Sequence, residues 1–191
     1  MRMELEEYGW VIDFLPRGRS DERMPEPSAQ LVGEHYFTLF EVTIKPAIRL
    51  DLGRRIYIGK GERAEVDRIR KRIAYDDLSA TSRSELNATL SRIVKAKEAE
   101  FINFFNKAGP LSVRLHQLEL LHGIGKKHLA QILAARDSKL FENFEDLRAR
   151  VPLLPDPVQL AAGRILEELS GKPQHYLFVR PPRPDDSHDR Y

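Results

Sequence analysis

The apolar residues of this 191-residue chain change their spacing near residue 80, and that change limits the folds open to it. Before residue 80 they alternate with polar residues, which is typical of half-buried strands; after it they recur every three or four residues, which is typical of helix faces. Strands followed by helices, instead of strands alternating with helices, favour an α+β fold over a parallel sheet. The sequence therefore predicts a strand-rich part, residues 1–80, before a helical one.

Four strands are predicted in the first part. The segment Tyr8–Leu15 places alternate residues on one face, and a charged, proline-containing loop follows it as far as Pro27. The other predicted strands cover about residues 34–45, 54–58 and 69–76. Short strands with long charged connections and then a long helix predict a small barrel of the oligonucleotide/oligosaccharide-binding (OB) type. A generic antiparallel α+β sheet is the alternative.

A single long helix is predicted from Ser82 to Ala108, with Ser82 and Glu85 as a capping box and Gly109-Pro110 as its end. Residues 81–109 would then connect the two halves of the chain. The next helix is expected to carry four regularly spaced leucines, namely Leu111, Leu115, Leu118 and Leu121.

The short segment His122-Gly123-Ile124-Gly125 is the strongest candidate for binding. Glycines allow a very tight turn between helices, and Ile124 can pack between the two helices. The first turn of the following helix leaves amide groups unpaired, which suits an anion, and Lys126 and Lys127 follow at once. Such contacts reach the phosphate backbone with little sequence preference. The alternative is that glycine merely ends one helix before another begins.

Residues 143–169 resemble a second, degenerate copy of this unit. A short helix over 143–150 is expected to precede the turn 151–155, and Asp156 would cap a helix that opens with Pro157. Prolines stand here in place of the glycines, so we expect this copy to be structural. Residues 110–171 would then form one paired helical domain.

A second set of candidates lies in the strand-rich part. Exposed aromatic residues of such a barrel stack on bases and neighbouring cations meet phosphates. The candidates are Tyr36, Arg54, Arg55, Tyr57, Lys60, Arg70, Lys71 and Arg72. Burial of the aromatic residues in the core and a solvated charged surface are the alternatives.

Composition excludes several classes of protein. The absence of cysteine excludes disulfides, thiolate metal sites and a cysteine nucleophile, and it favours the cytoplasm, as does the lack of an apolar signal or membrane segment. Asp146 and the pairs Asp76-Asp77 and Asp185-Asp186, the latter with His188, show no recognisable catalytic or metal-binding framework. We therefore expect that the protein is not an enzyme and that it binds no cofactor and no metal.

The segment Leu120–Lys127 resembles the helix-hairpin-helix motif of DNA-repair, recombination and RNA-associated proteins. Over nearly its whole length, including Tyr8–Val11 and Ala162–Leu169, the chain resembles an archaeal domain-of-unknown-function family, number 655, of predicted RNA-binding proteins. The resemblance implies a barrel-like domain before paired helix-hairpin-helix elements, with nucleic-acid contacts carried by Gly123, Ile124, Gly125, Lys126 and Lys127. It implies no reaction.

The same resemblance implies that residues 174–181 return as a strand of the N-terminal sheet. Residues 182–191 are polar, and we expect them to be disordered. The expected partner is nucleic acid, RNA in preference to DNA, and not a membrane. Because the formal net charge is only +2, a protein-interaction scaffold in a nucleic-acid-processing complex is the alternative function.

Overall fold

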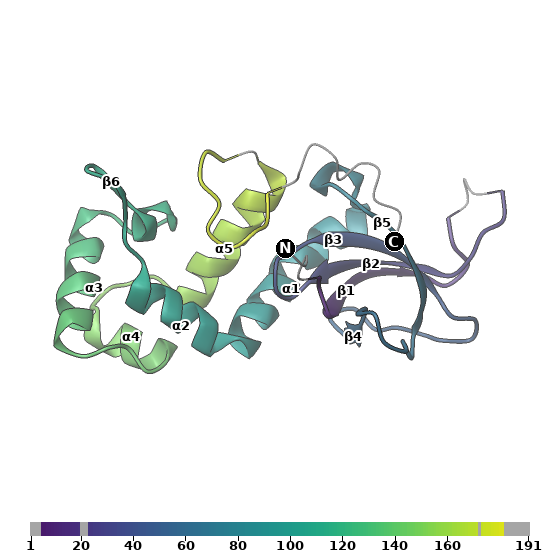
Figure 1. Cartoon of the computed structure of the whole chain (residues 1–191), viewed down its shortest axis with the longest axis horizontal. Coiled ribbons are helices and arrows are strands. Elements are labelled where there is room, and N and C mark those ends of the chain that lie inside the picture. The colour runs from purple at the N-terminus through teal and green to yellow at the C-terminus, as the bar shows by residue number, and fades with distance from the viewer. Residues whose placement is uncertain (1–4, 20–22, 172, 182–191) are drawn as a thin grey trace. The chain divides into compact units, whose positions relative to one another are not determined.

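The computed structural model describes residues 5–19, 23–171 and 173–181, and it divides the chain into two compact units. The first unit comprises the residues up to Thr89 and those from Glu168 onward, and the second runs from Leu90 to Glu167. Both divisions fall inside helices, α1 (Ala80–Ala96) and α5 (Pro157–Ser170). The fold is α+β, as the sequence predicts (Figure 1).

A curled, five-stranded antiparallel sheet forms the body of the first unit (Figure 1). Its strands are β1 (Tyr8–Leu15), β2 (Ser28–Gly33), β3 (Leu39–Ile44), β4 (Arg55–Tyr57) and β5 (Val66–Arg72). They are arranged in the order β4-β1-β2-β3-β5, so the ladders leave β4 and β5 at the two edges. A bulge between Val11 and Asp13 shifts the register of β1 against β2, which adds local bend and twist.

One face of this sheet carries the apolar core of the first unit. Residues alternate along β4 and just beyond it, because Ile56 and Ile58, the residue after the strand, are buried while Arg55 is exposed. The other members of the core cluster come from the other four strands and from the loop before β4, namely Val11, Ala29, Leu31, Phe40, Val42, Ile44, Leu50, Val66 and Ile69. Burial of so many β-branched and leucine side chains is the main force that holds the strands together.

The strand predicted over residues 34–45 is confirmed only in its second half, where β3 lies, because a turn occupies residues 34–38, and β2 before that turn was not predicted. The carboxylate of Glu6 accepts hydrogen bonds from the amides of His35, Tyr36 and Thr38, at 2.9, 2.7 and 3.3 Å. These amides are therefore unavailable to a strand ladder. Phe37 in the same turn has a φ of 55°, a left-handed conformation that reverses the chain. All six residues of β2 are buried, so the alternation that would have revealed it is absent.

The strand predicted over residues 69–76 is displaced, since β5 ends at Arg72 and Tyr75–Asp77 form a 3₁₀ turn, η1. The returning strand predicted over residues 174–181 is also wrong, because no strand occurs in the described residues 173–181. Glu168 instead accepts the amide hydrogens of Leu177, Phe178 and Val179. One backbone hydrogen bond, from Arg180 N to Tyr36 O at 3.3 Å, joins this segment to the turn after β2. The expected disorder of residues 182–191 lies outside the described residues.

The predicted continuous helix over residues 82–108 is two helices, α1 and α2 (Glu98–Lys107), which are interrupted at Lys97. The predicted capping box is wrong as well. The hydroxyl of Ser79 accepts the amide of Ser82 at 3.0 Å and caps α1, which starts two residues earlier than predicted. Ser82 lies buried in the first turn and donates its own hydroxyl to Gln30.

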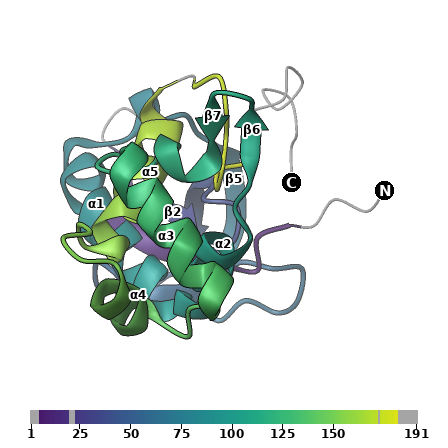
Figure 2. The ribbon, with the colours of Figure 1, turned by 90° about the vertical axis from the view of Figure 1, so that its left-hand side faces the viewer.

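The second unit contains α2, a small hairpin of β6 (Pro110–Ser112) and β7 (Leu115–His116), the 3₁₀ turn η2 (Gln117–Leu120), and helices α3 (Lys126–Ser138), α4 (Phe144–Arg150) and α5. The hairpin stands out from the helices (Figure 2). The helix predicted over residues 111–121 is therefore wrong. Gly109 and Gln117 close the base of the hairpin with two hydrogen bonds, and Leu111 is partly exposed, so the leucine spacing does not mark a buried helix face.

Candidate nucleic-acid interface

The turn before α3 has the geometry expected of a tight connection. Ile124 N donates to Leu121 O at 3.0 Å, and both side chains are buried. Gly123 has a φ of 105°, a conformation that favours glycine. The predicted placement of Ile124 as an apolar residue buried at the turn is confirmed.

The beginning of α3 is open. Gly125 occupies the N-cap position and supplies no side-chain cap, and a Cβ added to it would meet no described atom within 4 Å. The first hydrogen bond of the helix runs from Leu129 N to Gly125 O at 2.9 Å. The helix therefore makes no use of the amides of Lys126, Lys127 and His128. These donors and the helix dipole favour an anion at this end.

The two lysines of α3 differ in their surroundings. Lys126 Nζ contacts Glu119 Oε1 at 2.6 Å and Arg114 O at 3.2 Å, so its charge is partly satisfied within the protein. Lys127 is exposed and makes no hydrogen bond or ion pair with any residue in the described part of the chain. Of the two, Lys127 is the cation available to a ligand. His122 before the turn is exposed.

The acidic partner of Lys126 is fixed by η2. Glu119 Oε2 accepts the amide of His116 at 2.9 Å, and His116 Nδ1 accepts the amide of Leu118 at 3.1 Å. The hydrogen bond from Lys126 and that from the His116 amide lower the pKa of Glu119 below its usual value. Burial, with the charge of Arg136, lowers the pKa of His116. Glu119 is therefore charged at neutral pH and holds Lys126 beside the turn.

The turn between α4 and α5 repeats two backbone features of the first turn. Leu154 N donates to Val151 O at 3.3 Å, and both side chains are buried, as at the first turn. Leu153 corresponds to Gly123 and has a φ of 61°. A Cβ added to Gly123 would lie 3.2 Å from Pro155 Cγ, so the two turns pack closely. At the position of Gly123 the second turn has a leucine, and not the proline that the sequence prediction placed there.

The beginning of α5 is closed, in contrast to that of α3. Asp156 Oδ1 accepts the amide of Val158 at 3.1 Å, and Pro157 at the first helical position has no N–H. The negative charge of Asp156 would also repel an anion. Two turns with the same backbone hydrogen bond therefore precede two chemically different helix ends, and the second turn has one more residue before its helix.

Several of the cations predicted on the strands are paired within the protein. Arg54 forms an ion pair with Glu65 at 2.8 Å. Arg55 makes two hydrogen bonds of 2.7 Å to Glu34, which raise the pKa of Arg55, and its guanidinium lies 3.4 Å from the centre of the Tyr8 ring.

The other candidate residues of the first unit differ in their contacts and in their exposure. Tyr57 accepts a hydrogen bond from the amide of Gly61 at 3.1 Å. Arg70 binds Thr43 and contacts two glutamates, while Tyr36 lies against Arg180. Arg72 is partly buried, and Lys60 and Lys71 are exposed. The structure thus leaves the two lysines more accessible to a ligand than the arginines.

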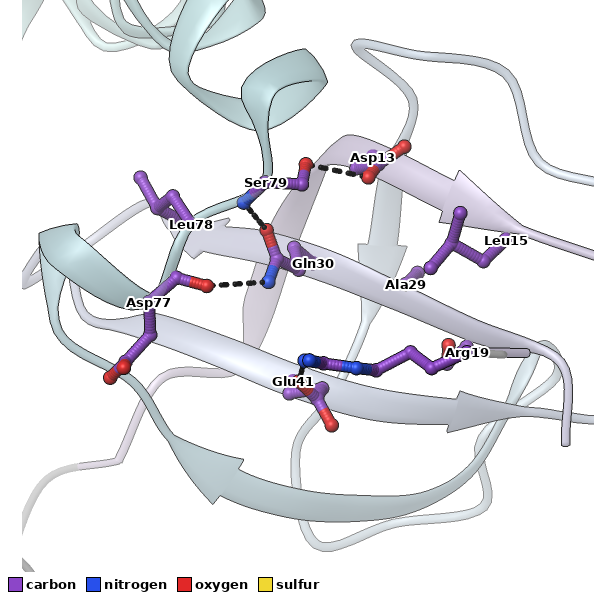
Figure 3. Close-up of a pocket in the computed structure, with 10 residues that line it drawn as sticks. Asp13, Leu15, Arg19, Ala29, Gln30, Glu41, Asp77, Leu78 and Ser79 are labelled. Carbon is purple, nitrogen blue, oxygen red and sulfur yellow. Dashed lines mark hydrogen bonds and ion pairs between the residues drawn. The ribbon is translucent and has the colours of Figure 1, made fainter. Parts of the chain in front are cut away.

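Sequence reasoning missed a pocket of about 220 Å³ between strands β1–β3 and the start of α1 (Figure 3). Asp13, Gln30 and Glu41 are register partners on three neighbouring strands and are all buried, although each is polar. Only the strand pairing brings them together, because 28 residues separate Asp13 from Glu41 and the sequence carries no local motif.

The part of the chain that the structure describes holds neither a metal-binding cluster nor a membrane-spanning helix. In that part of the chain no three His, Asp or Glu side chains are grouped to hold a metal ion. Nor does it contain a helix with the length and apolar character needed to cross a membrane. Asp185, Asp186 and His188, considered above as metal ligands, lie outside these residues.

Residues 5–180 match the family described as "Protein of unknown function (DUF655)", and the chain belongs to this family. It is 42% identical over 179 residues to the uncharacterised protein MJ0038 of Methanocaldococcus jannaschii, covering 93% of this chain and 81% of that protein. The crystal structure of Af1531 from Archaeoglobus fulgidus has a similar fold, with a TM-score of 0.86 and 39% identity over 92% of this chain and 100% of that one. The family resemblance inferred from the sequence is confirmed.

Proposed function

We propose that this protein is a non-catalytic nucleic-acid-binding protein that contacts the phosphate backbone at the start of α3. The observation that carries the proposal is the uncapped N-terminus at Gly125, open to solvent and followed by the unpaired Lys127. Three free amides and a lysine suit a phosphate oxygen. Such contacts do not read bases, so sequence preference is expected to be low.

In this proposal the segment around Gly123 is a helix-hairpin-helix unit whose first helix is reduced to the short turn η2. The second copy, between α4 and α5, is the structural partner. Two observations support this pairing of the two copies. The backbone hydrogen bond and the residue with positive φ occur in both turns, and Gly123 lies close to Pro155.

We also propose that the sheet of the first unit is a partly open barrel of the OB type. Five antiparallel strands and the strong curl support this, while β4 and β5 remain edges. Exposed Lys60 and Lys71 would give this unit a secondary contact with the nucleic-acid backbone. This unit is also the reason for preferring RNA over DNA, which a competition experiment with strands of matched sequence would test.

The central experiment measures binding of fluorescently labelled RNA and DNA, single- and double-stranded, by anisotropy over a series of salt concentrations. The informative variant is Gly125→Asp, which gives α3 the same kind of cap that Asp156 gives α5. The backbone at Gly125 (φ −92°, ψ −176°) is open to any residue, so the variant should fold. We expect affinity to fall about tenfold or more, since an attached carboxylate would occupy the amides and repel phosphate.

Gly125→Asn is the matched control, because asparagine caps the helix without a charge. An intermediate affinity would separate the occupation of the amides from charge repulsion. Circular dichroism and thermal unfolding check that both variants are folded. If Gly125→Asp binds as tightly as the wild type, the start of α3 is not the binding site.

The alternative function is a protein-interaction scaffold. It is favoured by apolar side chains that the second unit leaves exposed, since Leu153 is 88% and Leu140 61% exposed. This function predicts no salt-dependent affinity for any of the four nucleic acids. If the wild-type protein shows no salt-dependent affinity for any of them, the scaffold function is the better assignment.

A further inference from the structure

The pocket of the first unit is small but built from buried polar groups. Its volume of about 220 Å³ lies below the roughly 300–1,000 Å³ of pockets that hold whole cofactors or drug-sized ligands. It has room for one functional group and a short chain. Three strands, η1 and the residues before α1 contribute to its wall (Figure 3).

Asp13 is the least satisfied charge in this wall. Asp13 is only 7% exposed, and the hydroxyl of Ser79 donates a hydrogen bond to its Oδ2 at 2.6 Å. No described residue donates to Oδ1, and no cation of the described chain pairs with the carboxylate. A buried, unpaired carboxylate is costly unless something else compensates it.

The neighbours of Asp13 give only part of that compensation. The amide of Gln30 is fully engaged, because Nε2 donates to Asp77 O at 3.2 Å and Oε1 accepts from the amide of Ser79 and the hydroxyl of Ser82. The start of α1 provides a favourable dipole through Ser79. A dipole end carries about half an elementary charge, so it leaves the carboxylate short of a full counter-charge.

The other acidic side chains of the lining are already engaged, and the remaining walls are apolar. Glu41 is paired with Arg19 at 3.5 Å and with Arg70 at 3.4 Å. The carboxylate of Asp77 accepts the amide of Ala74 at 3.0 Å and points away from the other lining side chains (Figure 3). Leu15, Ala29 and Leu78 supply the apolar surface. A positive group fits beside Asp13, and methylene groups fit along the leucines.

We propose that this pocket binds an organic cation, an ammonium or guanidinium group on a short alkyl chain, with Asp13 as its counter-ion and Ser79 as the residue that positions the carboxylate. The cation can come from a free small amine or from a lysine or arginine side chain of another protein. The pocket is distant in the sequence from the start of α3. The proposal of a cation site does not depend on nucleic-acid binding.

The test is a titration of the ¹⁵N-labelled full-length protein by NMR with n-butylammonium, n-butylguanidinium and n-butanol, at constant ionic strength. We expect saturable shifts of the amides of Leu15, Ala29 and Ser79 with either cation and none with butanol. Asp13→Asn should weaken cation binding about tenfold or more, which is about 1.4 kcal/mol. Asp51→Asn, at an exposed aspartate of the same unit, should change nothing.

Leu15→Trp provides a second variant, since Leu15 is 37% exposed and a larger ring there should block the pocket without disturbing the core. It keeps the test decisive if Asp13→Asn does not fold. Absence of saturable binding by both cations, equal binding of butanol, or unchanged binding in the folded Asp13→Asn or Leu15→Trp protein would overturn the proposal.

A second arm separates the two sources of the cation. N-acetyl-arginine methylamide and N-acetyl-lysine methylamide carry the same charged groups in the form of a protein side chain. Binding at least tenfold tighter than that of the butyl cations would identify a side chain of a partner as the ligand. Equal or weaker binding would identify a free amine. Gly125→Asp should change neither the binding of the butyl cations nor that of the amino-acid derivatives. The failure of the cation proposal can therefore be distinguished from the failure of the nucleic-acid proposal.

Discussion

The two turns of the second unit share a backbone hydrogen bond and differ in what they present to solvent. Each has a hydrogen bond from a backbone amide to the carbonyl oxygen three residues earlier, a residue with positive φ and two buried apolar side chains. The turn before α3 ends in an open glycine, whereas the turn before α5 ends in a capping aspartate and a proline. The comparison teaches that the shape of such a turn sets packing, while the residue at the helix start decides whether an anion can bind.

The largest effect is expected at the left-handed position of the first turn. Gly123→Ala should lower the free energy of unfolding by about 2–3 kcal/mol, because a φ of 105° is strained for alanine and its Cβ would meet Pro155 at 3.2 Å. Chemical denaturation measures the change. A loss below the error of that measurement would mean that the turn rearranges freely, and that the two turns are not locked together.

Lys127→Gln tests which lysine reaches the ligand. We expect an affinity about threefold to fivefold lower and a slope of log affinity against log salt that is smaller by about one, because one phosphate contact is lost. Lys126→Gln is the matched control and should have the smaller effect, since Glu119 holds Lys126. The reverse order of the two effects would show that Glu119 releases Lys126 on binding.

The corresponding position of the second turn should respond in the opposite direction to Gly123. Leu153→Gly is expected to raise the free energy of unfolding by about 0.5 kcal/mol, because a left-handed conformation costs leucine about 1–2 kcal/mol and glycine returns part of this as chain entropy. Leu153 is exposed, so no burial is lost. Lower stability of the variant would indicate that Leu153 makes an apolar contact in solution, which would favour the scaffold function.

The smallest effect concerns the acidic neighbour of the first turn. Glu119→Gln should raise nucleic-acid affinity about twofold, because it removes a negative charge near the site and frees Lys126. Glutamine can still accept the amide of His116 through its oxygen, so η2 should persist. Anisotropy at low salt measures the change, and a weaker affinity would mean that Glu119 orders the site instead of competing for it.

The sequence predicted best those elements whose residues interact with their near neighbours. The bounds of β1, the cap of α5 at Asp156 and the buried position of Ile124 follow from alternation and capping, and the structure has them as predicted. The open start of α3 also follows from local rules, because Gly125 has no side chain to close it.

What the sequence could not predict depends on distant partners. The turn at residues 34–38 exists because Glu6 takes its amides, and the last described segment is irregular because Glu168 does the same. The pairing of Arg55 with Glu34 and the grouping of Asp13 with Gln30 likewise need the register of the sheet. No periodicity along the chain carries this information.

The position of Glu6 has a practical consequence for anyone who shortens this chain. The sheet begins at Tyr8, so a start there would seem to keep every strand. It would nevertheless leave three amides of the turn 35–38 without their acceptor, at a cost of about 1–3 kcal/mol for each donor that stays buried. The side chain of Glu6 also fills the space above Gly33. A shortened protein that is meant to report on binding must therefore retain this glutamate, although it belongs to no strand.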